Sequence, residues 1–254
     1  MEDFAYREQF DLEDEHWWFQ GRRAVIWSLL DRAGIGSGLR ILDAGCGTGR
    51  NLVEFGRLGQ AEGVDPSPEA VEFCRQRGLQ DVRLGALERL PFHPGAFDLL
   101  LATDVIEHVQ DDVAALGELR RVAAPGACLL VTVPAYHWLW SQHDVDLHHF
   151  RRYTWRRLRA RLAQTGWAPV SWSYFNSVLL APIAAVRLAG NRRAQADRNG
   201  SGAPADGERR ADLRLTPPAI NRVLQVPLRL EAGLIGRGLH LPAGVSIGAV
   251  CVAS

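Results

Sequence analysis

The sequence predicts an α/β fold: a Rossmann-like, seven-stranded, mostly parallel sheet with helices on both faces. Two observations predict it. Short apolar segments alternate with amphipathic segments over residues 39–135, which is the pattern of a parallel sheet whose strands are joined by helices. The segment FDLLLATDV at residues 97–105 is a continuous apolar run, as expected for a strand buried on both faces. Five strands are expected before residue 136 and two after it.

The first half of the chain holds five expected strands and the helices between them. The strands are expected at residues 39–45, 61–66, 81–86, 97–105 and 127–135, and the helices at 7–33, 49–59, 67–78 and 111–126. Ser67 provides an N-cap and Gly78 a stop signal for one of these helices. Pro125 and Gly126 are expected to close the last of them.

The pattern changes after the fifth strand. An amphipathic helix is expected at residues 154–166, a sixth strand at 167–175 and a seventh at 244–253. About seventy residues separate the last two strands, too many for a simple crossover. Within this insertion, residues 191–212 are polar and rich in Gly, Ala and Pro, which predicts a mobile segment. Both flanks of that segment are apolar and are expected to be helical.

Composition argues against several classes of protein. The chain has 254 residues, of which 29 are basic and 29 are acidic, so no overall field attracts it to nucleic acid. The first ten residues lack the regions of a secretory signal, and no apolar run reaches the ~18 residues of a membrane span. Four cysteines lie far apart without CxxC spacing, which predicts neither a zinc site nor a disulfide scaffold. A cytoplasmic location is expected.

The segment ILDAGCGTGRN at residues 41–51 carries the main functional signal. Gly45, Gly47 and Gly49 follow the first strand with GxGxG spacing, which is not the GxGxxG spacing of a dinucleotide site. Asp43 precedes them, where a carboxylate would repel a phosphate but could pair with an amino group. Asp65 ends the second strand, where an acid accepts hydrogen bonds from ribose hydroxyls. Together these features predict S-adenosylmethionine, not a nicotinamide cofactor.

The chain resembles the class I S-adenosylmethionine-dependent methyltransferases, of the type 11 group that includes ubiquinone-pathway-like O-methyltransferases. LDAGCGTG is similar to their first motif, and GVDPSPEAV to their second-strand acidic loop. GALERLPFHPGAFDLLLATDVIEHV resembles their adenine-side loop and fourth strand, and RVAAPGACLLVTVPA their next helix and fifth strand. The resemblance covers residues 39–135 and implies a seven-stranded sheet whose last strand is antiparallel to the others.

The resemblance also implies cofactor contacts by position: the glycine turn for the methionine portion, then a ribose acid, an adenine loop and a far wall. The implied contacts are Asp43, Gly45, Cys46, Gly47, Gly49, Asn51, Asp65, Pro66, Ala86, Leu87, Thr103 and Asp104. The chain departs from many relatives at the adenine, because no acidic residue precedes Ala86. Backbone groups or Glu88 would have to take that role.

The N-terminal segment EHWWFQGRR resembles one found in a subset of these methyltransferases. This resemblance suggests that Trp18 and its aromatic neighbours form a lid over the cofactor, with Arg22 facing the cofactor carboxylate. The alternative is that the aromatic side chains only attach the first helix to the sheet. The sequence leaves both open.

Two histidine clusters lie where the carboxyl ends of the strands are expected. His108 follows the fourth strand, and His143 and His148 lie in HDVDLHHFRRY after the fifth. Methyl transfer to a hydroxyl needs a proton acceptor, and histidine suits that role near neutral pH. His108 has an alternative role in shaping the pocket. The second cluster has two alternatives, structural hydrogen bonding and metal binding; a metal is not required for the chemistry, and none is expected.

The end of the second cluster is basic. Arg151 and Arg152 are expected to clamp a phosphate or carboxylate of the acceptor, with Tyr153 beside them. The alternative is that the two arginines form a solvated helix start. The sequence does not separate these readings.

Residues 1–254 are expected to form a single methyltransferase domain. Its expected parts are a helical lid at 1–38, a cofactor-binding core at 39–173, a helical cap at 174–244 and the last strand at 245–254. The cap has apolar residues with interspersed arginines, which suits a roof over the active site and also a helix on a membrane surface. A homodimer is left open, because nothing in the sequence sets the oligomeric state.

The expected function is methyl transfer from S-adenosylmethionine to an oxygen of a small-molecule, sugar or lipid-linked acceptor. The alternatives are N- or C-methylation of a natural-product or sugar intermediate, and non-catalytic binding of S-adenosylmethionine. No nucleic-acid partner is expected.

Overall fold

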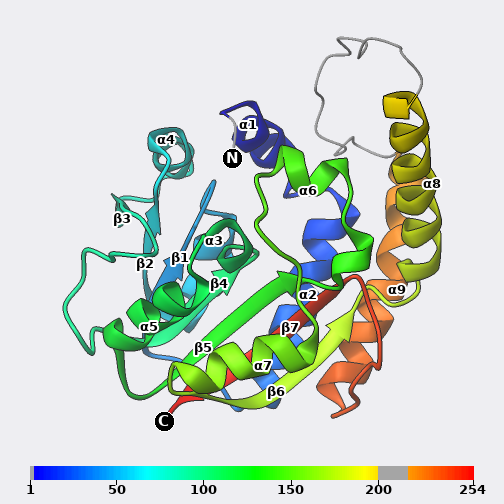
Figure 1. Ribbon diagram of the computed structural model, residues 1–254. Helices are drawn as coiled ribbons and strands as arrows, with labels where there is room; N and C mark the ends of the chain where they lie inside the picture. Colours follow the sequence, from blue (N-terminus) through cyan, green and yellow to red (C-terminus); the bar gives the residue numbers. More distant parts are fainter. Residues whose placement is uncertain (1–2, 200–216) are drawn as a thin grey trace.

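The computed structural model describes residues 3–199 and 217–254 (Figure 1). Seven strands form one sheet in the order β3-β2-β1-β4-β5-β7-β6. The strands are β1 Leu39–Ala44, β2 Gly59–Asp65, β3 Val82–Leu84, β4 Phe97–Thr103, β5 Ala123–Pro134, β6 Trp167–Phe175 and β7 Ser246–Ala253. Strand β7 is antiparallel to both of its neighbours, and the other pairs are parallel. The predicted fold class is confirmed.

Helices cover both faces of this sheet (Figure 1). They are α1 Asp3–Leu12, α2 Trp17–Arg32, α3 Arg50–Phe55, α4 Pro68–Gln76, α5 Asp112–Val122, α6 Gln142–Asp146, α7 Trp155–Gln164, α8 Leu180–Asn199 and α9 Pro218–Gly236. Three short 3-10 helices are η1 Gly56–Leu58, η2 Ile106–His108 and η3 His137–Leu139.

Strand β4 shows how the two faces are filled. Leu99 and Leu101 belong to the hydrophobic cluster that includes residues of α2, α3 and α9, whereas Leu100 and Ala102 belong to the cluster with α5 and α7. Successive side chains of a strand point to opposite faces. A continuous apolar run is therefore what a strand between two helical layers requires.

The expected single helix at residues 7–33 is wrong, because the structure has two helices there. His16 is extended and caps α2 by accepting a hydrogen bond from the Trp18 amide at 3.3 Å. Just before it, the buried Glu13 side chain forms an ion pair with Arg77 at 2.6 Å. The local cap and the distant arginine together favour a break that helical periodicity does not show.

The expected end of the helix at 111–126 is also wrong. Helix α5 ends at Val122, and Ala123 is already extended and pairs with Phe97 of β4. Pro125 and Gly126 therefore lie inside β5. Pairing with the neighbouring strand decided the boundary, and the helix-stopping residues did not.

The segments predicted to form a lid (residues 1–38) and a cap (residues 174–244) pack against each other through α2 and α9. A Cβ at Gly21 would lie 2.3 Å from Leu228 Cδ1, so the close approach of these helices requires glycine. The Asn221 side chain accepts a hydrogen bond from the Trp17 amide at 2.7 Å. Of the expected mobile segment, residues 191–199 continue α8 and residues 200–212 lie outside the described part of the chain. Among the described helices, none combines the length and the hydropathy of a membrane span.

Candidate cofactor and acceptor site

The glycine turn joins β1 to α3 at the carboxyl edge of the sheet. Gly45, Gly47 and Gly49 have φ of 77°, 53° and 82°, in the left-handed region that favours glycine. A Cβ at Gly45 would lie 2.6 Å from the Val105 side chain. The backbone amides of Gly45 and Cys46 both donate to the Val64 carbonyl of β2, at 2.8 and 3.1 Å. The turn thus lies against the ends of β2 and β4, where parallel sheets bind ligands.

Asp43 lies beneath this turn and is fully buried, at 0% exposure. Neither of its carboxylate oxygens has a hydrogen-bond partner among the described residues. Burial raises the pKa of Asp43 to about 7, against the opposing charge of Arg22. A buried polar group without a partner is costly and rare. An ammonium group would supply the missing charge and donors, so this residue fits the amino end of S-adenosylmethionine.

Asp65 ends β2 and is held by protein donors. The Gly47 amide donates to one carboxylate oxygen at 2.8 Å, and the Ser67 amide donates to the other at 3.0 Å. The Tyr6 hydroxyl of α1 also donates to Asp65, at 3.3 Å. The two amides hold the carboxylate in place. The Tyr6 hydroxyl donates to it in the way that a ribose hydroxyl would.

Arg22 of α2 enters the site from the helical side. It is 8% exposed and forms an ion pair with Asp104, while its Nε has no partner among the described residues. Asp104 follows β4 with φ of 56° and accepts a hydrogen bond from Thr132 at 3.1 Å. Asn51 donates to Thr103 at 2.9 Å. The structure therefore brings the predicted glycine turn, far wall and arginine together.

The remaining predicted cofactor residues lie at the edges of this site. Leu87 is buried, whereas Pro66, Ala86 and Glu88 are exposed. Trp18 stacks on Phe175 of β6, with ring centroids 5.9 Å apart and planes at 14°. This contact supports the reading that the tryptophan attaches α2 to the sheet, and the lid role of Trp18 stays a prediction.

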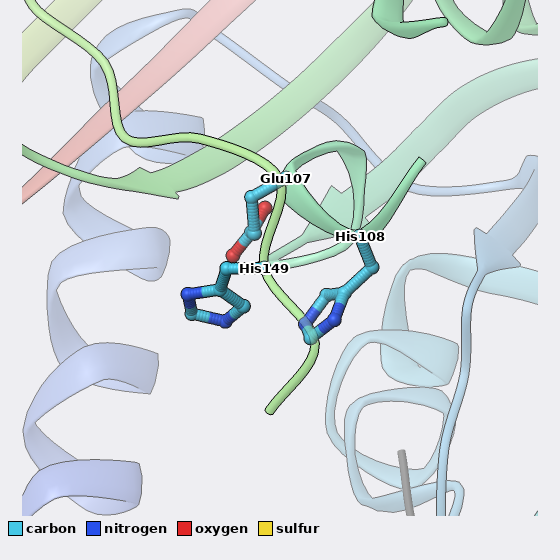
Figure 2. A group of neighbouring side chains, drawn as sticks. All are labelled: Glu107, His108 and His149. Carbon is cyan, nitrogen blue, oxygen red and sulfur yellow. The ribbon is translucent and has the colours of Figure 1, made fainter. Parts of the chain in front are cut away.

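Glu107, His108 and His149 form a cluster beyond the end of β4 (Figure 2). Their potential ligand atoms all lie within 4.8 Å of one another. The two imidazole rings meet edge to face, with centroids 4.6 Å apart. Burial and the neighbouring His149 lower the pKa of His108 to about 3, whereas burial and Asp104 raise the pKa of Glu107 well above its usual value. His108 is therefore a neutral imidazole near pH 7.

Asp144 of α6 organises the loop that carries His149. It is 0% exposed and accepts hydrogen bonds from Arg152 Nε at 2.7 Å and from the Ser141 amide at 3.0 Å. Its carboxylate also lies 2.9 Å from Nδ1 of His149. Burial alone would raise the pKa of Asp144, but the bond to His149 and the charge of Arg152 hold it well below its usual range.

The predicted acceptor residues are distributed over different environments. Arg152 is 3% exposed and also donates to the Ala135 carbonyl at 2.8 Å, and the buried Tyr153 hydroxyl donates to Asp112 at 2.9 Å. Both side chains therefore have internal partners. Arg151 pairs with Asp112 at 3.2 Å and lines an open depression of about 660 Å³. That depression is also lined by Gln110, Asp111, Asp112, Val113, Phe150, Arg157 and Arg161.

The histidines of the second cluster separate in the structure. His143 lies on α6, and His148 is exposed with φ of 56° in the turn that follows. Their neighbour His149 is the one that meets His108, and no sequence pattern distinguished it from His143 and His148. Three histidines within seven residues gave no spacing by which to choose among them, since only the fold of the loop decides which ring points inward.

Comparisons with known proteins identify relatives of part of the chain. A methyltransferase-domain family matches residues 42–131. The ubiquinone biosynthesis O-methyltransferase of Bradyrhizobium sp. is 39% identical over 108 residues, which cover 40% of this chain and 42% of that protein. Norajmaline N-methyltransferase of Rauvolfia serpentina is 37% identical over 100 residues, covering 36% and 34%. The chain thus spans less than half the length of these curated relatives.

A solved structure extends the similarity to the whole fold. One chain in a complex between the Haloferax volcanii Trm112 methyltransferase activator and a methyltransferase matches with a TM-score of 0.61 and 19% identity. The match covers 98% of this chain and 94% of that chain, and at this identity it shows the fold alone. Residues 42–131 therefore match a methyltransferase domain, the chain has the fold of class I methyltransferases, and S-adenosylmethionine is the cofactor that these findings support.

Proposed function

We propose that this protein transfers the methyl group of S-adenosylmethionine to an oxygen of a small-molecule, sugar or lipid-linked acceptor. The observation that carries the proposal is the buried Asp43 carboxyl, which has no partner among the described residues and lies beneath a glycine turn with Asp65 at the next strand end. The methionine ammonium of the cofactor would give Asp43 the partner it lacks, and the ribose hydroxyls would donate to Asp65, which the Gly47 and Ser67 amides already hold in place.

Each part of the site has a role in this proposal. Asp43 binds the cofactor ammonium, the free Nε of Arg22 faces its carboxylate, and Asp65 accepts hydrogen bonds from the ribose. The bound cofactor supplies a methyl group on a sulfonium, from which the sulfur departs readily as a neutral thioether. The protein then has to align the nucleophile and exclude water. His108, as a neutral imidazole, can accept a hydrogen bond from an acceptor hydroxyl and orient its oxygen.

Oxygen is the favoured acceptor atom for two reasons. A hydroxyl has a proton to lose, and the site offers a neutral imidazole to receive its hydrogen bond. The similar Bradyrhizobium protein is named an O-methyltransferase, although a comparably similar Rauvolfia protein is named an N-methyltransferase. Methylation of nitrogen or carbon and non-catalytic cofactor binding are the outcomes against which O-methylation is tested. His143, His148 and Arg151 stay proposed acceptor contacts.

The surface of α9 supports an amphiphilic acceptor or a membrane contact. Four apolar side chains at helical spacing are at least half exposed: Ile220, Val223, Val226 and Leu230. Arg222 and Arg229 lie on the same helix. An exposed apolar stripe with arginines suits the headgroup region of a membrane.

Calorimetric titration with S-adenosylhomocysteine tests the cofactor site. Asp65→Ala should weaken binding by roughly 1.5–3 kcal/mol, because a carboxylate accepting ribose hydroxyls makes charged hydrogen bonds. Asp98→Ala is the matched control, since this partly exposed acid pairs with Arg40 at the amino ends of β4 and β1, opposite the carboxyl edge that carries the glycine turn. Equal affinities for wild type and Asp65→Ala would remove Asp65 from the site.

Transfer of labelled methyl groups to fractionated acceptors tests the reaction. A labelled ether or ester in the product supports O-methylation. A labelled amine or carbon skeleton would show methylation of nitrogen or carbon instead, and cofactor binding without any transfer supports the non-catalytic alternative.

Sedimentation with anionic vesicles tests the membrane contact. Val223→Asp with Leu230→Asp should release the protein from vesicles, while Val53→Asp on α3 should not. If the double variant instead converts a dimer to a monomer, the stripe is a subunit interface.

A further inference from the structure

We propose that Glu107, His108 and His149 bind one divalent transition-metal ion, for which zinc is the reference ion. Glu107 and His108 come from η2, directly after β4, and His149 comes from the loop after α6 (Figure 2). Two imidazoles and one carboxylate are the ligand set of many zinc and iron sites. This site departs from the sequence expectation of chemistry without a metal.

The geometry of the three side chains suits a single ion. Their ligand atoms lie within 4.8 Å of one another. Ligands on one tetrahedral zinc, with bonds near 2.1 Å, lie roughly 3.4 Å apart. Side-chain movements that shift each ligand atom by about 1 Å would bring all three within bonding distance of one ion. The backbone already joins the two segments, because the Phe150 amide donates to the Glu107 carbonyl at 2.8 Å.

Glu107 itself points to a ligand. The residue is 1% exposed, and neither carboxylate oxygen has a hydrogen-bond partner among the described residues. The nearby guanidinium groups are engaged elsewhere: Arg22 pairs with Asp104, and Arg152 pairs with Asp144. A buried carboxyl group without hydrogen bonds is costly. A cation between the two imidazoles would give this group the partner it lacks.

His149 is oriented as metal-binding histidines are. Its Nδ1 lies 2.9 Å from Oδ1 of Asp144. A carboxylate can only accept, so Nδ1 carries a proton and Nε2 is the nitrogen available to bind a metal. A carboxylate behind a ligating imidazole is the usual arrangement in metal sites, where it fixes the tautomer and the ring. Arg152 and the Ser141 amide hold Asp144 in turn.

The ion would keep open coordination positions. His108 is partly exposed, whereas the His149 side chain is 7% exposed and Glu107 is buried, so the three protein ligands leave a further coordination position next to His108. With the ion bound, an acceptor hydroxyl would bind it as a further ligand and become more acidic, in place of the hydrogen bond that the hydroxyl would make to His108 when no ion is bound. This role for the ion rests on the proposed methyl transfer; the binding of the ion does not.

Zinc titration of the chelator-treated full-length protein tests the site. Wild type should bind one Zn²⁺ by calorimetry, and Mg²⁺ alone should bind at least tenfold more weakly, because imidazole ligands favour transition metals. Glu107→Gln and His149→Ala should each weaken zinc binding at least 100-fold. The control is His148→Asn, which changes the exposed neighbouring imidazole and keeps a residue that tolerates positive φ; its affinity should equal that of wild type.

Two further measurements separate folding from binding. Circular dichroism of the metal-free variants checks that they are folded, and the visible spectrum of Co²⁺-loaded protein should lose intensity in Glu107→Gln even if melting temperatures are unchanged. No zinc binding by wild type, or equal binding by Glu107→Gln, would overturn the proposal. Titration with S-adenosylhomocysteine is independent of the ion, so either proposal can fail while the other stands.

Discussion

Asp43 and Asp144 are both 0% exposed, yet their surroundings are opposite. Asp43 lies under the glycine turn without a hydrogen-bond partner among the described residues, and burial raises its pKa to about 7. Asp144 accepts bonds from Arg152 and Ser141 and contacts His149, so its pKa is held below the usual range. The same residue type at the same depth therefore lies in two opposite electrostatic environments.

The difference teaches how to separate a ligand site from a structural ion pair. The bonds of Asp144 lie within the protein, and they fix the loop that carries His149. Asp43 has no such bonds, so its buried carboxyl group destabilises the folded protein until a ligand binds to it. Ligand-binding sites often contain groups that lower the stability of the ligand-free protein. Four predictions test this contrast, from the largest expected effect to the smallest.

The largest effect is expected from Asp144→Ala. The change leaves the buried Arg152 guanidinium without its ion-pair partner, and breaking a buried pair in this way costs about 3–5 kcal/mol. Urea unfolding followed by tryptophan fluorescence measures the loss. The control is Asp146→Ala, since Asp146 is exposed on the same helix. A loss below about 1 kcal/mol for Asp144→Ala would show that this ion pair does not stabilise the loop.

A pH dependence of stability is expected from Asp43. Burial raises its pKa to about 7 in the folded protein, from the ordinary value of about 3.9 for an aspartate in an unfolded chain. Between these values the folded state retains a proton that the unfolded state has lost, so this contribution to stability falls as pH rises from about 4 to about 7. The full fall is on the order of 4 kcal/mol. Asp43→Asn should remove it, and identical pH profiles of unfolding for the two proteins would contradict this account.

Asp43→Asn should also weaken S-adenosylhomocysteine binding at pH 7.5. Asparagine keeps the shape but removes the charge, and a hydrogen bond to a charged group contributes about 1.5–3 kcal/mol. Calorimetry should therefore show a roughly 10- to 150-fold higher Kd. Unfolding at the same pH should show no comparable loss of stability, in contrast to Asp144→Ala. A variant that binds normally would mean that the cofactor amine lies elsewhere.

The smallest effect is expected from Tyr6→Phe. The Tyr6 hydroxyl donates to Asp65 at 3.3 Å, so a ribose that binds this carboxylate has to displace it. Removing one such hydrogen bond should tighten S-adenosylhomocysteine binding by about 0.5–1 kcal/mol, or roughly two- to fivefold. Weaker binding in Tyr6→Phe would show instead that α1 supports the bound cofactor.

Much of the candidate cofactor site could be predicted from local sequence. Gly45, Gly47 and Gly49 adopt the positive φ that their spacing after a strand predicts, and Asp65 ends the second strand as expected. Such features depend on a few consecutive residues, whose backbone and side-chain preferences act over short distances. The break between α1 and α2 did not follow, because the ion pair between Glu13 and Arg77 joins residues far apart in the chain.

The amino-acid sequence by itself determined the sheet, the glycine turn and the positions of Asp43 and Asp65 at strand ends, since alternating hydrophobicity and glycine conformations act locally. Only the tertiary structure decided which histidine meets His108. His149 points inward because Asp144 holds its ring, and Arg152 holds Asp144. It likewise left Asp43 and Glu107 buried without hydrogen-bond partners within the described residues. Burial and pairing are properties of packed surroundings, and no pattern of neighbouring residues encodes them.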